Sequence, residues 1–242
     1  MDRRQLVEKY GRTKIARESL GMRIAKEFHD GDYVNLGRGL PVLAADFVDP
    51  SIDIFYHGEP GLMGYGTGVG MDEWEDIDPI LHDAANRHVR AKAGMVFFDM
   101  GEAFNMLRGK HLDAVVIGGF EVSEKGDLSS WTFKYPVAHS GISIGGGFDL
   151  VVGAKRLIVV VTHLDKDGKP KIVRKLQYPI TGAKEHADLV ITDLAVFDVE
   201  GPKGNKKGLV LREIAPGWNV DELRAVTEGE FEVSPALKVY EL

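Results

Sequence analysis

The sequence predicts an α/β fold, with an open, largely parallel β-sheet flanked by helices. Strongly apolar segments such as residues 112–123 (LDAVVIGGFEVS) and 155–164 (KRLIVVVTHL) are typical of strands that are buried on both faces. Between them lie segments whose apolar residues recur every three or four positions, which is the period of a helix. Alternation of the two patterns is expected of parallel strands joined by helices.

The first expected helix covers residues 12–29. Apolar side chains recur there at every fourth position from Ala16 to Phe28, and Asp30 and Gly31 follow as an end signal. Further helices are expected over residues 79–90, 101–110 and 219–227.

Strands are expected where short apolar runs lead into glycine or other turn residues. Residues 188–199 read as two short strands with a turn near Asp193. The other strands are expected within residues 33–41, 51–56, 94–99, 112–123, 155–164 and 206–217. No internal repeat or Pro/Ser-rich linker divides the chain, so we expect a single domain over residues 1–242.

The composition excludes several classes of protein. A net charge of −7 and scattered basic residues argue against a nucleic-acid partner, because such binding depends on clustered cations. With no cysteine, the chain has no disulfide, thiolate metal site or cysteine nucleophile, which fits a reducing compartment. The charged N-terminus has no apolar core of a signal peptide, and no apolar run reaches about 18 residues. We therefore expect a cytoplasmic protein with no membrane partner.

Glycines gather where the predicted strands end. In open α/β sheets, ligands bind beyond the carboxyl ends of the strands, so these loops are expected to share one pocket, although glycine is also ordinary in turns. The clusters are Gly37 and Gly39, Gly58 to Gly70, Gly118 and Gly119, and Gly145 to Gly147.

Common phosphate, metal and hydrolase motifs are absent. The sequence contains neither G-x-x-x-x-G-K-[ST] nor G-x-S-x-G. His82 and His88 are six residues apart, so on a helix they would face different directions and would not share a metal ion. No metal site is expected.

Glu59 is the one acid in the glycine-rich segment HGEPGLMGYG, which follows a predicted strand. A carboxylate is ionised at neutral pH and needs no neighbouring base to act as a nucleophile. The glycines would let a bulky acyl group approach the backbone. From these residues alone, Glu59 is either a catalytic carboxylate or an incidental acid in a surface turn.

The order of several segments resembles the β subunit of family I CoA-transferases, the B-type subunit of 3-oxoacid/acetate CoA-transferases. Residues 34–66 resemble the family's V-N-L-G-I-G-L-P turn and the S-E-N-G motif that carries its catalytic glutamate. Residues 104–131 and 144–163 resemble its R-G-x-H-x-D and G-M-G-G-A-M-D-L-V blocks. The resemblance runs from about Lys14 to Leu237.

The resemblance implies an open α/β fold related to that of sugar-phosphate isomerases. It also implies a homologous α subunit as partner, in an α2β2 assembly, with the active site between the two halves. Glu59 would be the nucleophile that exchanges CoA between an acyl-CoA and a free carboxylic acid through a glutamyl-CoA thioester. Gly146 and Gly147 would form the oxyanion hole, and Arg38, Gly39 and Gly61 would bind substrate. Coenzyme A is then a substrate, and no metal or organic cofactor is expected.

Four departures from the family pattern bear on the substrate. Pro60 replaces the usual Asn after the glutamate, Arg38 replaces an apolar residue, and Gly147 replaces Ala. Residues 132–143 also differ from the usual loop. Together they suggest an acid other than the commonest succinate/acetoacetate pair.

Two alternatives to a CoA-transferase subunit remain: a CoA-thioester or C–C hydrolase of the same superfamily, and a ligand-binding or scaffold subunit without chemistry of its own.

Overall fold

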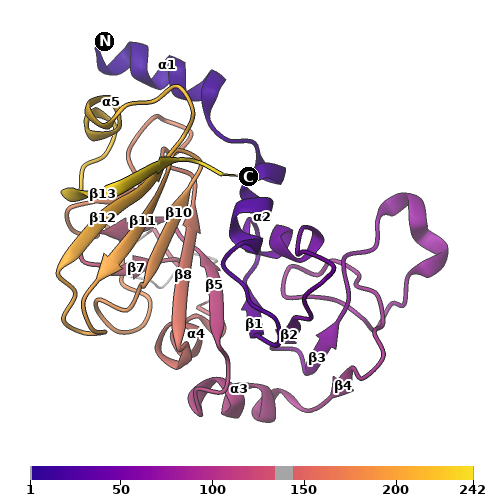
Figure 1. Cartoon of the computed structure of the whole chain (residues 1–242). Coiled ribbons are helices and arrows are strands. Elements are labelled where there is room, and N and C mark those ends of the chain that lie inside the picture. The colour runs from indigo at the N-terminus through magenta and orange to yellow at the C-terminus, as the bar shows by residue number, and fades with distance from the viewer. Residues whose placement is uncertain (1, 134–143, 242) are drawn as a thin grey trace.

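The computed structural model describes residues 2–133 and 144–241 of the chain (Figure 1). Its helices are α1 (Arg3–Thr13), α2 (Arg17–Ala25), the 3-10 helices η1 (Pro41–Asp46) and η2 (Met71–Asp76), α3 (Met100–Arg108), α4 (Gly147–Gly153) and α5 (Val220–Ala225). Its strands are β1 (Tyr33–Leu36), β2 (Phe55–Gly58), β3 (Leu62–Tyr65), β4 (Val96–Phe97), β5 (Ala114–Gly118), β6 (Glu121–Ser123), β7 (Leu128–Ser129), β8 (Arg156–Val161), β9 (Ile172–Val173), β10 (Leu189–Thr192), β11 (Ala195–Glu200), β12 (Gly208–Ile214) and β13 (Phe231–Val239).

The main sheet has ten strands in the order β13-β12-β11-β10-β8-β5-β1-β2-β3-β4. Strands β10, β8, β5, β1 and β2 form its parallel centre. Antiparallel strands extend it on both sides, through β3 and β4 at one edge and β11 and β12 at the other. The predicted open and largely parallel sheet is therefore confirmed. The edge strand β13 has no counterpart among the predicted elements.

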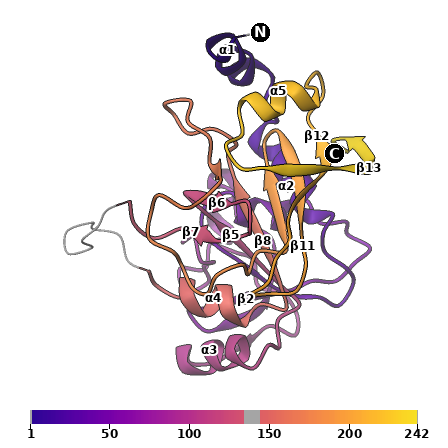
Figure 2. The same cartoon turned by 90° about the vertical axis from the view of Figure 1, so that its left-hand side faces the viewer.

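Two apolar cores cover the two faces of the central strands. In β5, Val115 and Ile117 belong to one core, whereas Ala114 and Val116 belong to the other. This alternation follows from the two-residue period of a strand. Helices α1, α3, α4 and α5 contribute to the first core, and α2 and η1 to the second. Helices α3 and α4 lie at one end of the molecule and α1 and α5 at the opposite end in both views (Figure 2).

The predicted helix over residues 12–29 is shorter in the structure and is preceded by a separate helix. Lys14 and Ala16 are extended, with ψ angles of 151° and 159°, so α1 ends before them and α2 begins after them. The Ile15 N–H donates to the carbonyl of Asp193, which ties this break to the end of β10. The apolar period correctly marked a buried helix face, since Leu20 and Ile24 of α2 are buried. The tertiary contact at Ile15, however, keeps α2 from extending back to residue 12.

The predicted helix over residues 79–90 is wrong. This segment is a hairpin in which His82 pairs with His88 in an antiparallel bridge. The Asp83 carboxylate accepts hydrogen bonds from the backbone N–H groups of Ala85 and Arg87, and Asn86 adopts a left-handed φ of 61°. Asp and Asn stabilise such turns through side-chain bonds to their own backbone, which the apolar spacing does not reveal.

Buried ion pairs connect α2 to the main sheet. The Arg23 guanidinium donates two hydrogen bonds of 2.8 Å to Glu213 on β12 and lies 2.7 Å from Glu27. Arg156 and Arg212 also contact Glu27. Burial alone would raise the pKa of Glu27, but these three guanidinium groups lower it to about 2. The network gives α2 one position on the second core.

Candidate active site

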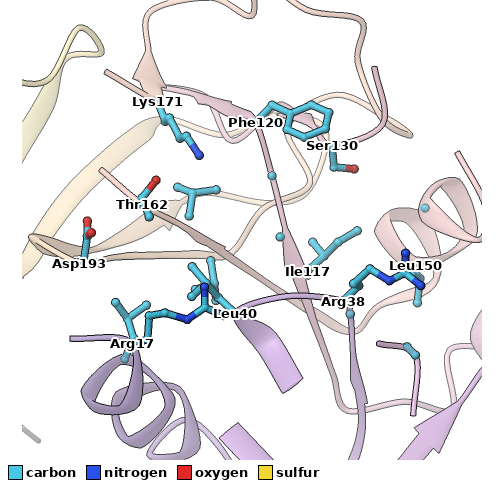
Figure 3. A pocket seen from close by; sticks show the side chains of 18 of the residues that line it. Arg17, Arg38, Leu40, Ile117, Phe120, Ser130, Leu150, Thr162, Lys171 and Asp193 are labelled. Atoms are coloured by element: carbon cyan, nitrogen blue, oxygen red, sulfur yellow. The ribbon is translucent and has the colours of Figure 1, made fainter. Parts of the chain in front are cut away.

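A cleft of about 880 Å³ opens at the carboxyl ends of the parallel strands. Its lining includes the residues that directly follow the strands: Gly37 after β1, Glu59 after β2, Thr162 after β8 and Asp193 after β10. Figure 3 shows how side chains from these separate segments surround the cavity. The expectation that the glycine-rich strand ends share one pocket is confirmed, as this position is the usual ligand site of an open α/β sheet.

Glu59 sits in the tight turn that joins β2 to β3, and its side chain is half-buried. Gly61 closes this turn: its N–H donates to the Gly58 carbonyl over 3.0 Å, and its carbonyl accepts from Phe98 N–H over 2.9 Å. Gly61 has a φ of 115°, and a Cβ there would lie 2.1 Å from the Phe98 oxygen, so only glycine fits. The turn thus holds the Glu59 backbone rigidly at the edge of the cleft.

Within the described residues, the Glu59 carboxylate receives one side-chain hydrogen bond, from Asn35. The Asn35 amide nitrogen lies 3.3 Å from Glu59 Oε1. Burial raises the pKa of Glu59, and this hydrogen bond opposes the rise because it stabilises the charged form. No ion pair to Glu59 occurs within residues 2–133 and 144–241. The carboxylate is therefore partly desolvated, and no cation among the described residues neutralises it.

Gly146 and Gly147 lie directly before and at the start of α4 and line the same cleft. A Cβ at Gly146 would lie 3.7 Å from the Glu59 carboxyl carbon and 2.8 Å from the Phe104 ring. The Gly147 N–H donates to the Ile144 carbonyl over 2.9 Å, so it is already occupied. Among the described residues, the Gly146 N–H has no such partner. Of the two predicted oxyanion donors, Gly146 has the available amide.

Of the three predicted substrate-binding residues, one lines the cleft and two do not. The exposed Arg38 lines the cleft, but Gly39 and Gly61 are not among its lining residues. Gly39 lies in the turn beside Arg38 with a φ of 99°, and both backbone groups of Gly61 are used by the turn that carries Glu59. In this structure the two glycines shape the backbone of their turns, and their role in binding substrate stays a prediction.

Among the described residues, four cations line the cleft, and three of them were not singled out from the sequence. They are Lys14, Arg17, Arg38 and Lys171. None makes an ion pair with another residue in the described part of the chain. Of the acids in the lining, Asp193 accepts from the Tyr10 hydroxyl and the His163 N–H, each at 2.7 Å. The positive charges are scattered through the sequence and come together only in the fold, as Figure 3 shows for Arg17, Arg38 and Lys171.

Asn35 and His57 were also missed as site residues, although Asn35 lies in the V-N-L-G segment.

Residues 134–143, which include most of the loop said to depart from the family pattern, lie outside the described residues. In the part that is described, no group of three or more His, Asp or Glu residues could hold a metal ion. No helix there has the length and apolar character needed to cross a membrane.

Several relatives share more than a third of their aligned residues with this chain. It is 39% identical over 214 residues to the B subunit of 3-oxoadipate CoA-transferase from Acinetobacter baylyi, covering 88% of this chain and 94% of that protein. It is 36% identical to the B subunit of a probable succinyl-CoA:3-ketoacid coenzyme A transferase from Bacillus subtilis, covering 93% of this chain and 98% of the relative. It is 38% identical to the human mitochondrial succinyl-CoA:3-ketoacid coenzyme A transferase 2, covering 94% of this chain but only 42% of that longer protein.

Solved structures share the fold at lower identity. An acyl-CoA transferase of Escherichia coli O157:H7, in a thioester complex with CoA, matches with a TM-score of 0.67 and 23% identity, over 95% of this chain and 43% of the other. The decarboxylase AibA/AibB matches with a TM-score of 0.63 and 19% identity, over 93% of this chain and 88% of the other. Since one is a transferase and the other a decarboxylase, these likenesses establish the fold alone.

The match to the sequence profile of one protein family establishes which family this chain belongs to. The profile described as Coenzyme A transferase matches residues 17–225, which contain Glu59, Gly146 and every strand of the parallel centre. Together with the three relatives, this match shows that the chain belongs to the coenzyme A transferase family.

Proposed function

We propose that this chain is the β-type subunit of a CoA-transferase that exchanges CoA between an acyl-CoA and a free carboxylic acid through Glu59. The observation that carries the proposal is the position of the Glu59 carboxylate, which borders the strand-end cleft with one neutral hydrogen-bond donor and, among the described residues, no cation. A carboxylate that is poorly solvated and free of an ion pair retains its nucleophilicity.

The proposed reaction has two halves. A Glu59 oxygen attacks the thioester carbonyl carbon, and the tetrahedral oxyanion collapses with departure of the CoA thiolate, which leaves an acyl-glutamyl anhydride. The thiolate then attacks the Glu59 carboxyl carbon and displaces the first acid as its carboxylate. The resulting glutamyl-CoA thioester is attacked by the second acid, and the same steps in reverse release the new acyl-CoA.

Each addition creates an oxyanion that a fixed N–H group would stabilise. We assign this role to the Gly146 amide, because Gly146 lies beside Glu59 and its N–H has no backbone partner among the described residues. Gly147 takes part by shaping the turn, since its own N–H is bonded to Ile144. This refines the expectation that both glycines donate.

An α-type partner is part of the proposal. Both bacterial relatives are named as B subunits, and the human relative is more than twice as long as the matched region. Apolar side chains exposed on β4, α3 and α4 support a partner surface beside the cleft: Phe97 is 62% exposed, Met100 59% and Phe148 52%. We expect an α2β2 assembly, which a mass measurement in solution tests.

For the substrate we propose an acid with a second carboxylate. The relatives' names specify 3-oxoadipate and succinyl groups, whose parent acids are dicarboxylic, beside a 3-ketoacid, and the cations of the cleft suit an anionic ligand. The CoA phosphates have the same charge, so a panel of monocarboxylic and dicarboxylic acyl-CoA thioesters should be assayed with both subunits present. Preference for the dicarboxylic members would support the assignment, and equal rates would contradict it. Whether succinate and acetoacetate are excluded stays a prediction.

The decisive experiment is mass spectrometry of the purified complex with acyl-CoA. Borohydride reduction or hydroxylamine capture of the thioester should modify this chain at Glu59, and the Glu59→Gln variant should remain unmodified. Transfer that proceeds without an adduct on this chain would refute the mechanism. Transfer by the α subunit alone would favour the scaffold alternative.

A further inference from the structure

Asn35 and His57 form a buried contact directly behind Glu59. They are paired in register across the parallel strands β1 and β2, and their side chains are 0% and 1% exposed. The Asn35 amide nitrogen lies 3.1 Å from His57 Nδ1, 3.1 Å from the His57 carbonyl and 3.3 Å from Glu59 Oε1. The NH₂ group of Asn35 thus faces three acceptor atoms: two belong to His57 on β2, and the third is an oxygen of the Glu59 carboxylate.

The protonation of the His57 ring follows from its other nitrogen. His57 Nε2 lies 3.2 Å from the carbonyl oxygen of Ala103 on α3, which can only accept a hydrogen bond. Nε2 therefore carries the proton, and Nδ1 presents a lone pair to Asn35. Burial lowers the pKa of His57, which keeps the ring neutral at neutral pH.

This tautomer determines which way the Asn35 amide faces. All three neighbours of its nitrogen accept hydrogen bonds, so the NH₂ group must point toward them and Oδ1 away. Oδ1 is buried and has no partner in the described part of the chain. A flipped amide would direct Oδ1 at the Glu59 carboxylate and repel it. The chain from Ala103 through His57 and Asn35 thus maintains a hydrogen-bond donor toward Glu59.

We propose that Asn35 and His57 are positioning residues that hold Glu59 through one oxygen while a neutral amide preserves its charge. This proposal rests on the proposed function for its chemical meaning, because it concerns the nucleophile of that reaction. Asn35 binds Oε1, which leaves Oε2 to attack the thioester. A lysine or arginine in the same place would also bind Oε1, but it would neutralise the nucleophile. An amide orients the carboxylate without that loss.

The described surroundings of Glu59 contain no other group that would control its charge near neutral pH. On β2 the titratable neighbour is His57, and on β3 it is Tyr65, whose pKa burial raises far above neutrality. Helix α3 and the loop before α4 contribute Phe104 and Gly146, which do not titrate. The Asn35 hydrogen bond is therefore the main interaction that favours the ionised form.

The proposal is tested by the pH dependence of carbodiimide labelling at Glu59 in the purified complex, followed by peptide mass spectrometry. Carbodiimides react with the protonated carboxyl, so the labelling midpoint reports the Glu59 pKa without any use of CoA chemistry. Asn35→Leu removes the donor and should raise the midpoint by about one pH unit. Asn35→Asp, which keeps the shape and adds a like charge, should raise it further.

His57 provides the matched pair of variants. His57→Gln retains one acceptor and one donor and should keep the midpoint close to that of the wild type. His57→Leu retains neither and should shift it in the same direction as Asn35→Leu. Thermal melting of each complex identifies variants that fold, and only these are compared. Unchanged midpoints in folded Asn35→Asp and His57→Leu complexes would overturn the proposal.

A single-turnover reaction with acyl-CoA separates this proposal from the proposed function. If the midpoints shift as expected and the wild type forms no adduct at Glu59, the positioning contact stands and the transfer mechanism fails. If the adduct forms and the midpoints do not respond to any of the variants, the mechanism stands and the positioning role is refuted.

Discussion

Gly146 lies against Glu59: a Cβ on this glycine would come within 3.7 Å of the Glu59 carboxyl carbon. The two residues reach this contact from different parts of the sheet, one from the turn after β2 and the other from the loop before α4. A glycine backbone beside a carboxylate nucleophile is the combination that an acyl-transfer site requires. Activity should therefore respond to changes at either residue.

Glu59→Gln is expected to lower the rate of CoA transfer by at least about a thousand-fold, because it removes the proposed nucleophile. The variant should also be no less stable than the wild type. Burial raises the pKa of Glu59 in the folded state, so the ionised side chain disfavours folding at pH values above its ordinary value of 4.5. At neutral pH the melting temperature of the variant should equal or exceed that of the wild type, and the difference should shrink as the pH falls toward 4.5 and be absent below it. A variant that melts well below the wild type at neutral pH would contradict this.

Gly146→Ala is expected to reduce kcat by about ten- to a hundred-fold in the α-containing complex, because its Cβ would meet the Phe104 ring at 2.8 Å and displace the amide from Glu59. Gly147→Ala is the matched control. Its Cβ would meet Thr181 Cγ2 at 3.2 Å and would contact neither Phe104 nor Glu59, so most of the activity should remain. Equal losses in the two variants would show that the Gly146 amide has no special role.

Arg38→Ala is expected to raise KM for the anionic substrate about ten-fold, equivalent to about 1.4 kcal/mol, with little change in stability. Arg38 is exposed at the cleft and has no ion pair within the described residues, so the fold does not depend on it. Steady-state kinetics of the complex provide the measurement. Arg12→Ala, which removes an exposed arginine outside the cleft, should leave KM unchanged.

Glu27→Gln is expected to destabilise the chain by about 3 kcal/mol, because it leaves the buried guanidinium of Arg23 partly uncompensated. The pKa of Glu27 is about 2 in the folded state against an ordinary value of 4.5, so its stabilising effect is present above 4.5 and is lost as the pH falls toward 2. Denaturant titrations at several pH values should show the gap between the two proteins closing over that interval. A constant gap would mean that the charge of Glu27 is not the cause.

The success and failure of the sequence-based predictions have physical reasons. The strands at residues 114–118 and 156–161 were predictable because burial on both faces demands continuous apolar runs. The hairpin formed by residues 79–90 was not predictable, because Asp83 and Asn86 set its turn through local hydrogen bonds that override the apolar period. Likewise, no local pattern in the sequence indicates that Lys206 is buried, yet its amino group lies 2.8 Å from Asp188 in the interior.

By itself, the sequence determined the parallel sheet and the glycine-rich turn that carries Glu59, because both depend on local pattern and on the order of segments along the chain. Only the tertiary structure decided which groups meet the carboxylate. Strand register brings Asn35 beside His57 and Glu59, and the packing of α3 and α4 brings Gly146 against it. The raised pKa of Glu59 belongs to this second level, since desolvation is caused by atoms from separate elements that surround the carboxylate only after folding.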